Sequence, residues 1–125
     1  MKEDAKVILC IDDDPDMLEL LTAVLEQEGY RVRTAGSAEE GIRIYKEEKP
    51  ALILVDLMME EVDAGTNFVK ELRLIGEPPP ILMLSSVGDS LALSTDYSEL
   101  GLAGVLQKPV QPEVLLNTVR SKLGD

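Results

Sequence analysis

The sequence predicts an α/β fold, a doubly wound five-stranded parallel sheet with helices on both faces. Two observations lead to this prediction. Apolar runs of strand length alternate five times with segments whose apolar residues recur at helical spacing. Several of the runs are almost continuously aliphatic, which is typical of parallel strands covered on both sides. With 45% hydrophobic residues, the span 1–125 is expected to form one domain with a full core.

Five segments are predicted to be strands, joined by right-handed crossovers. Three of them are near-continuous aliphatic runs, namely Val7–Ile11, Leu52–Val55 and Ile81–Leu84. Arg31–Ala35 alternates polar and apolar residues, which suits a strand at the edge of a sheet. Gly104–Leu106 is a short fifth candidate.

Five helices are predicted, one after each strand. The second opens with Ser37 as N-cap and Glu40 at the capping-box position, and the last has Pro112 near its start. Gly76 and Gly101 close the third and the fourth. The apolar faces of the five helices, in chain order, are formed by Leu18, Leu21 and Leu25; Ala38, Ile42 and Tyr45; Phe68, Leu72 and Ile75; Leu93, Tyr97 and Leu100; and Leu115, Val119 and Leu123.

Composition argues against several classes of function. A net charge of −12 repels nucleic acid and anionic membranes, so neither is an expected partner. The chain has no histidine, which removes histidine-dependent nucleophilic catalysis, histidine–metal sites and a phosphohistidine carrier. No segment resembles a membrane span or a signal peptide. The single cysteine, Cys10, is interpreted as a small buried hydrophobe, which suits a reducing cytoplasmic setting.

Reactive side chains follow four of the five predicted strands. In doubly wound sheets, ligands bind at the carboxyl ends of the strands. All of these residues should therefore emerge at one edge and form one site. They are Asp12 and Asp13 after the first strand, Asp56 after the third, Ser85 and Ser86 after the fourth, and Lys108 with Pro109 just beyond the fifth.

The chemistry of this set is specific. Three carboxylates carry about −3 charges, which one divalent cation and one ammonium group nearly neutralise. Ligands that are all oxygen select Mg²⁺, or Mn²⁺, over zinc. A carboxylate beside such a metal can attack phosphorus and form an aspartyl phosphate. The lysine and a serine hydroxyl would then hold the remaining phosphoryl oxygens.

The stretch CIDDDPDML separates into two parts. Asp14 precedes Pro15, which suits an N-cap followed by the first helical residue, and Asp16 falls in the first turn, where negative charge complements the helix dipole. Folding alone explains these two carboxylates. Asp12 and Asp13 repel each other at a strand end, which brings no gain without a cation.

Two other interpretations of Asp12-x-Asp14-x-Asp16 were weighed. The spacing imitates the start of an EF-hand calcium loop, but Met17 and Ala23 stand where that loop requires glycine and glutamate. It also imitates an aspartate-nucleophile phosphatase motif. That class needs a large cap and further acidic pairs, for which the chain is short.

The sequence resembles the receiver domain of two-component response regulators over essentially its whole length. The segments that carry the resemblance, in order, are ILCIDDDPDMLELL, GYRVRTAGSAEEGI, KPALILVDLMM, ILMLSS and LQKPV. The resemblance implies a flavodoxin-like (βα)5 fold with strand order 2-1-3-4-5. It also implies a phosphorylation-controlled switch rather than a conventional turnover enzyme, one that catalyses its own phosphorylation and dephosphorylation.

The resemblance assigns roles to the residues at the strand ends. Asp56 corresponds to the phosphoacceptor. Asp12, Asp13 and Asp56 correspond to the Mg²⁺ ligands, with the backbone carbonyl of Met58 as a further ligand.

The other strand-end residues correspond to the groups that respond to the phosphoryl group. Ser85 corresponds to the switch hydroxyl, and Ser86 to the small neighbour that leaves room for the phosphoryl group. Lys108 corresponds to the lysine that pairs with phosphate, and the Lys108–Pro109 bond is usually cis in the family.

The sequence departs from the family pattern in two places. Glu60 stands where receivers commonly have proline, and the glycine of the usual Asp-Gly turn comes one place late, so residues 60–66 are expected to form an altered loop. Val105 stands where many receivers carry tyrosine or phenylalanine. Its side chain is small and stiff. The switch is therefore expected to act through the loop after Ser85 or through another residue such as Tyr97.

By the same resemblance, Met58 and Val87 flank the approach of the hydrolytic water. Both are apolar and offer that water no hydrogen bond, so slow to moderate self-dephosphorylation is expected.

The implied partners are proteins. The phosphoryl donor would be a sensor histidine kinase or a histidine phosphotransfer protein, and the receiver of the signal a downstream protein or an output domain. A phosphorylation-dependent homodimer is consistent with the resemblance. The alternatives are a receiver-like interaction module that acts without phosphate, and the receiver part of a longer DNA-binding regulator.

Overall fold

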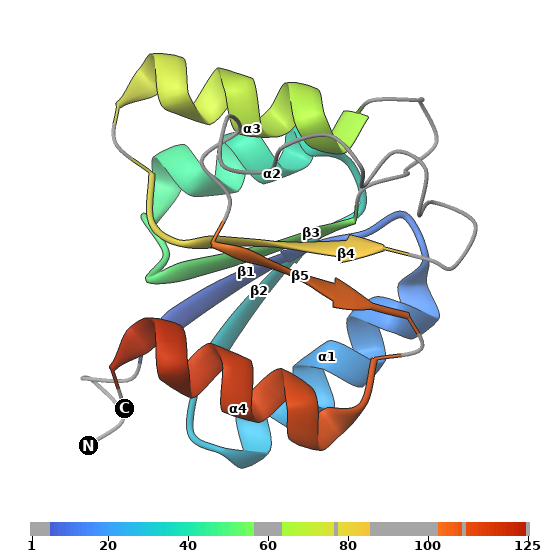
Figure 1. The fold of residues 1–125 in the computed structure, drawn as a ribbon. Helices are drawn as coiled ribbons and strands as arrows, with labels where there is room; N and C mark the ends of the chain where they lie inside the picture. The colour runs from blue at the N-terminus through green and yellow to red at the C-terminus, as the bar shows by residue number, and fades with distance from the viewer. Residues whose placement is uncertain (1–5, 57–63, 77, 86–102, 109, 125) are drawn as a thin grey trace.

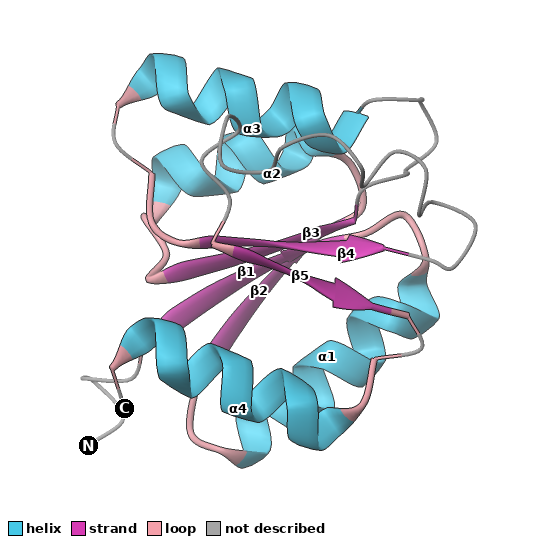
Figure 2. Cartoon of the chain, viewed as in Figure 1, coloured by secondary structure: helices cyan, strands magenta, loops and turns pink. Residues whose placement is uncertain are grey.

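The computed structural model describes residues 6–56, 64–76, 78–85, 103–108 and 110–124. Its strands and helices alternate along most of the chain (Figures 1 and 2). The strands are β1 (Val7–Ile11), β2 (Arg31–Ala35), β3 (Leu52–Asp56), β4 (Ile81–Ser85) and β5 (Gly104–Gln107). The helices are α1 (Pro15–Gln27), α2 (Ala38–Glu47), α3 (Ala64–Ile75) and α4 (Pro112–Leu123).

The strands form one parallel sheet in the order β2-β1-β3-β4-β5. Helices α2 and α3 cover one face of the sheet, and α1 and α4 cover the other (Figure 1). The predicted doubly wound fold, its strand order and the edge position of β2 are therefore confirmed. Strands β1 and β3 lie side by side near the centre of the sheet, so their carboxyl ends are neighbours.

Burial on both faces explains the continuous aliphatic runs. All five residues of β1, β3 and β4 are buried. Because side chains alternate across a strand, each run supplies two cores. A fully buried leucine or isoleucine stabilises the fold by about 1.5–3 kcal/mol relative to an exposed one. The strand residues of one core are Leu9, Ile11, Ile53, Val55, Ile81 and Met83, and those of the other are Ile8, Cys10, Leu52, Leu54, Leu82 and Leu84.

Cys10 belongs to the second core and is fully buried. Its thiol is free, and burial together with the nearby Asp12 charge raises its pKa far above the ordinary value. The thiol therefore stays protonated and packs as a small apolar group, as the sequence predicted.

The helix caps follow the sequence signals. The Asp14 carboxylate accepts a hydrogen bond from the backbone N–H of Asp16 (3.0 Å) at the start of α1. The Ser37 hydroxyl accepts one from Glu40 (3.1 Å) at the start of α2. The reciprocal bond of the capping box is displaced by one residue, because the Glu40 carboxylate accepts from the N–H of Gly36 (2.7 Å).

The structure changes two boundaries. Asp56 and Ser85 are the last residues of β3 and β4, one residue beyond the expected strand ends. Residues 64–66 are helical and begin α3, so the altered loop expected over 60–66 is wrong for this part. A glycine inside a helix costs only about 1 kcal/mol relative to alanine, which the apolar face of the same helix can outweigh. Residues 60–63 lie outside the described ranges.

The helix expected around Leu93, Tyr97 and Leu100 also lies outside the described residues. The last predicted helix, with Leu115, Val119 and Leu123, is α4. In the part of the chain that is described, none of the helices has the length and apolar character needed to span a bilayer.

Candidate metal centre

Three carboxylates gather at the carboxyl edge of the sheet. Asp12 follows β1 directly, Asp13 comes next, and Asp56 ends β3. One oxygen atom from each of the three carboxylates lies within 4.8 Å of the other two. Asp12 is fully buried and Asp56 is 3% exposed, whereas Asp13 is open to solvent. The cluster therefore has a buried wall and one side through which an ion can enter.

Lys108 reaches this cluster from just beyond β5. Its ammonium nitrogen lies 3.0 Å from Asp12 Oδ2 and 3.1 Å from Asp56 Oδ1. Its backbone N–H donates to the carbonyl of Ser85 (2.6 Å), which continues the β4–β5 ladder past the end of the strands. The ladder thus holds the base of the side chain while its four-carbon stem extends past β4 to β3 and β1.

The Asp12 carboxylate is held at both of its oxygens. Oδ2 accepts from Lys108, and Oδ1 accepts from the backbone N–H of Asp14 (2.9 Å). Residue 14 therefore acts twice, as the N-cap of α1 through its side chain and as a support for Asp12 through its backbone. Sequence reasoning assigned only the first of these roles. The aspartate-x-aspartate spacing permits the second, but a local turn is needed to create it.

The charges of the site perturb two pKa values. Burial and the nearby Asp12 charge raise the pKa of Asp56 from 3.8 to about 6, although Lys108 acts in the opposite direction. For Lys108, burial alone would lower the pKa of the ammonium group. The hydrogen bond to Asp12 and the negative charges of Asp56 and Asp12 outweigh that effect and raise it. Lys108 is thus firmly cationic, while Asp56 ionises with difficulty.

The residues fit a hard divalent cation. With all three carboxylates ionised, one ammonium group leaves a formal charge of −2. Every side-chain donor atom in the cluster is a carboxylate oxygen, which suits Mg²⁺ or Mn²⁺ better than zinc. Because Asp13 is exposed, water and phosphoryl oxygens can complete an octahedral shell on that side.

The remaining predicted residues lie in different places. Ser85 is fully buried at the end of β4, the strand between Asp56 and Lys108. Val105 in β5 is half-buried and packs against the core under α2 and α3. Four of the predicted positions, together with Tyr97, lie outside the described residues; these four are Met58, Ser86, Val87 and Pro109.

Sequence reasoning did not find a second surface feature, a shallow groove between α1 and β2. Its lining consists of ordinary helix and strand residues, including Leu18, Thr22 and Thr34, and carries no chemical motif. The only signal in the sequence was the exposed face of the first helix beside an edge strand, and this face does not distinguish a groove from a flat surface.

Comparison with known families and curated proteins agrees with the geometry. The family model described as "Response regulator receiver domain" matches residues 8–120. The transcriptional regulatory protein GlrR of Escherichia coli is 34% identical over 116 residues, which cover 93% of this chain and 26% of that protein. A probable transcriptional regulator, ycf27 of Cyanophora paradoxa, is 36% identical over 123 residues, which cover 98% and 50%. The chain thus spans about a quarter to a half of these relatives.

Solved structures give the same result at the level of the whole domain. A putative response regulator from Chloroflexus aurantiacus superimposes with a TM-score of 0.84 at 31% identity, covering 98% of this chain and 100% of that one. The chemotaxis response regulator CheY4 of Vibrio cholerae superimposes with a TM-score of 0.84 at 28% identity, covering 95% and 99%. By its sequence, its sheet and its relatives, the chain belongs to the response regulator receiver domain family.

Proposed function

We propose that this receiver domain accepts a phosphoryl group on Asp56 and thereby changes its binding to a protein partner. The observation that carries the proposal is the position of Asp56. Its carboxylate ends a central strand and lies between two other carboxylates and the Lys108 ammonium group. A structural aspartate at a strand end would require neither the acidic neighbours nor the lysine.

The Asp56 carboxylate would serve as the nucleophile. One of its oxygens attacks the phosphorus atom of a phosphohistidine, the bond between phosphorus and the histidine nitrogen breaks, and the nitrogen keeps the electron pair. With a pKa of about 6, most of Asp56 is ionised at neutral pH and can attack. The donor would be a sensor histidine kinase or a histidine phosphotransfer protein.

The surrounding residues would stabilise the transferred group. Asp12, Asp13 and Asp56 would hold Mg²⁺ or Mn²⁺, which when bound supplies positive charge to the phosphoryl oxygens. Lys108 supplies a second positive charge, and its ammonium group is already within 3.1 Å of Asp56. The backbone carbonyl of Met58 remains the proposed further ligand.

The signal would leave the site through β4 and β5. Phosphorylation replaces one charge on Asp56 with about two and adds new hydrogen-bond acceptors. The new oxygens attract Lys108 and the Ser85 hydroxyl, whose backbones are joined by the 2.6 Å hydrogen bond. A shift there moves the ends of both strands together, and with them the surface that a downstream protein or output domain recognises.

A second setting is favoured by the relatives. GlrR and ycf27 are named as transcriptional regulators, and this chain matches only part of each. In this setting the domain is the receiver part of a longer DNA-binding regulator, and nucleic acid is bound by the output part. The acidic charge of −12 supports this division of labour. A cytoplasmic location is part of either proposal, since the free thiol of Cys10 suits a reducing compartment.

Acetyl phosphate provides the test. The purified protein is incubated with acetyl phosphate and MgCl₂, and the phosphoryl adduct is measured by intact mass spectrometry. The adduct is expected in the wild type and in Asp16→Asn, an exposed first-turn aspartate of the same stretch. It should be absent in Asp56→Ala and in samples with excess EDTA. An adduct that persists in Asp56→Ala would refute the assignment, and loss of the adduct in both variants would point to a general effect of acidic substitutions.

A further inference from the structure

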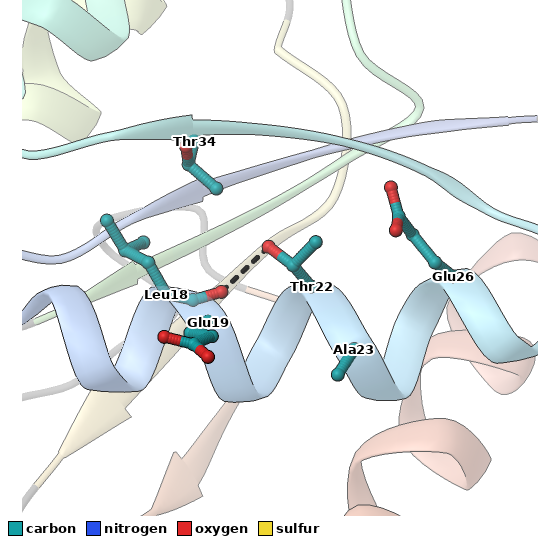
Figure 3. Close-up of a pocket in the computed structure, with 6 residues that line it drawn as sticks. All are labelled: Leu18, Glu19, Thr22, Ala23, Glu26 and Thr34. Atoms are coloured by element: carbon teal, nitrogen blue, oxygen red, sulfur yellow. Dashed lines mark hydrogen bonds between the residues drawn. The ribbon is translucent and has the colours of Figure 1, made fainter.

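A groove of about 360 Å³ lies between α1 and β2 (Figure 3). Its lining residues are Leu18, Glu19, Thr22, Ala23 and Glu26 of α1 and Thr34 of β2. Strand β2 is at the edge of the sheet, so no other described strand continues the sheet beyond it. The proposed phosphoryl transfer uses none of these residues.

The floor of the groove is mostly apolar. Leu18 and Thr22 of α1 face Thr34 on the neighbouring strand (Figure 3). The Thr22 hydroxyl donates to the Leu18 carbonyl at 2.7 Å, so its hydrogen-bonding capacity is already used within the helix. Ala23 adds a methyl group. A floor of this composition suits an aliphatic side chain rather than a polar one.

The rim of the groove is acidic. Glu19 and Glu26 are exposed and stand seven residues apart, two helical turns and about 10 Å along the same side of α1. Within the described part of the chain, neither carboxylate forms an ion pair. In contrast, Glu28 at the end of the same helix is paired with Arg120, and Glu48 is paired with Arg33.

We propose that this groove docks a basic amphipathic helix of a partner protein. Two cationic side chains seven residues apart in the partner would pair with Glu19 and Glu26, and an aliphatic side chain between them would fill the floor over Leu18 and Thr22. The charge of −12 disfavours a second copy of this chain as the occupant. It equally disfavours an anionic membrane surface.

Docking at this groove is independent of the phosphoryl transfer. Helix α1 begins beside the carboxylate cluster and runs away from it, and Glu26 lies about 16 Å along the helix axis from Pro15. A helix centred on Thr22 therefore leaves the edge above Asp56 open. The groove would hold a partner that localises or regulates the domain while the phosphoryl donor reaches Asp56.

Two synthetic helical peptides of equal composition test the proposal. The first has lysine at positions i and i+7 with leucine at i+3 and i+4. The second has the same residues permuted so that the lysines lie on opposite faces. Binding is followed by ¹H–¹⁵N NMR titration on the whole protein. The first peptide is expected to shift the amide signals of Leu18, Thr22 and Thr34, and the second to bind more weakly.

Charge variants provide the matched control. Glu19→Gln/Glu26→Gln should weaken binding of the first peptide by about three- to tenfold, because each rim ion pair contributes modestly. Glu39→Gln/Glu113→Gln, which removes the same charge from exposed first turns of α2 and α4, should leave binding unchanged. Equal losses in both double variants, signals that shift elsewhere, or no binding would overturn the proposal.

Two further measurements separate this proposal from its neighbours. Sedimentation at increasing concentration detects self-association, and a dimer whose NMR shifts map to the groove would overturn the basic-helix proposal. The acetyl phosphate adduct is measured on Glu19→Gln/Glu26→Gln and is expected at the wild-type level. If Asp56 were not the phosphoacceptor, the adduct assay would fail while peptide binding stayed intact, so the two failures are distinguishable.

Discussion

At the scale of single residues, Asp56 is the least comfortable charge in the described site. Burial and the charge of Asp12 raise its pKa to about 6. A carboxyl group whose folded-state pKa exceeds its unfolded value binds its proton more tightly when folded. Stability is therefore lost as pH rises from about 4 to about 6, and the loss persists at neutral pH. This strain is relieved when a cation or a phosphoryl group with its metal is bound.

Asp56→Asn should stabilise the metal-free protein. The amide keeps a hydrogen-bonding oxygen for Lys108 without the unfavourable charge. In EDTA at about pH 7.5, we expect the free energy of unfolding to rise by on the order of 1–2 kcal/mol, and at about pH 3.5 the two proteins should be nearly equal. Urea unfolding followed by circular dichroism measures this. A variant less stable than wild type at the higher pH would contradict the assignment of strain.

Lys108→Met should have the opposite effect. The ammonium group is bound to two carboxylates, and its removal leaves the buried Asp12 and Asp56 charges uncompensated. We expect a loss of about 1–3 kcal/mol in EDTA. Saturating MgCl₂ should recover more stability in the variant than in wild type, because the metal restores the missing positive charge.

Thermal unfolding with and without MgCl₂ measures both effects of Lys108→Met. Lys70→Met, on the exposed side of α3, is the control and should change neither value appreciably. A variant that Mg²⁺ stabilises no more than it stabilises wild type would argue against a shared charge site.

At the scale of elements, the beginning of α1 combines two functions in one turn. The side chain of Asp14 caps the helix, while its backbone N–H supports Asp12. Asp13, the residue between them, is exposed and contributes to the carboxylate cluster. Neighbouring aspartates should therefore respond differently to substitution.

Asp14→Ala and Asp13→Ala should separate stability from metal binding. Loss of the cap at residue 14 is expected to cost about 1 kcal/mol and to change Mg²⁺ affinity little, since the backbone N–H remains. Asp13→Ala should weaken Mg²⁺ binding severalfold without lowering the stability of the metal-free protein, because it removes a repelling charge. Isothermal calorimetry and urea unfolding measure the two properties. Equal effects of the two substitutions on both properties would refute this separation.

The elements themselves follow from local patterns to a large extent. The caps at Asp14 and Ser37 and the proline that starts α4 were all legible, because capping bonds join residues two or three apart. The start of α3 was not. A late glycine suggested a loop over residues 60–66, but the backbone is helical from Ala64, since a single glycine is too weak a signal to outweigh an amphipathic helix.

At the scale of the whole molecule, the dominant property is charge. Twenty-four acidic residues oppose twelve basic ones, and the resulting self-repulsion destabilises the compact state. Raising salt from about 0.02 M to about 0.5 M should therefore raise the unfolding temperature of the protein in EDTA. Sodium and choline chloride should act alike if screening is responsible. An effect confined to one cation would indicate specific ion binding instead.

The sequence by itself determined the elements and the list of reactive residues. Aliphatic runs, helical spacing and caps are local signals, and polar residues that follow such runs must lie at the carboxyl edge of a parallel sheet. Tertiary structure alone decided which of them touch. Lys108 and Asp12 are 96 positions apart, and they meet because the strand order and the ladder beyond β4 and β5 bring them together. The raised pKa of Asp56 and the groove between α1 and β2 likewise depend on burial and packing, which no local pattern specifies.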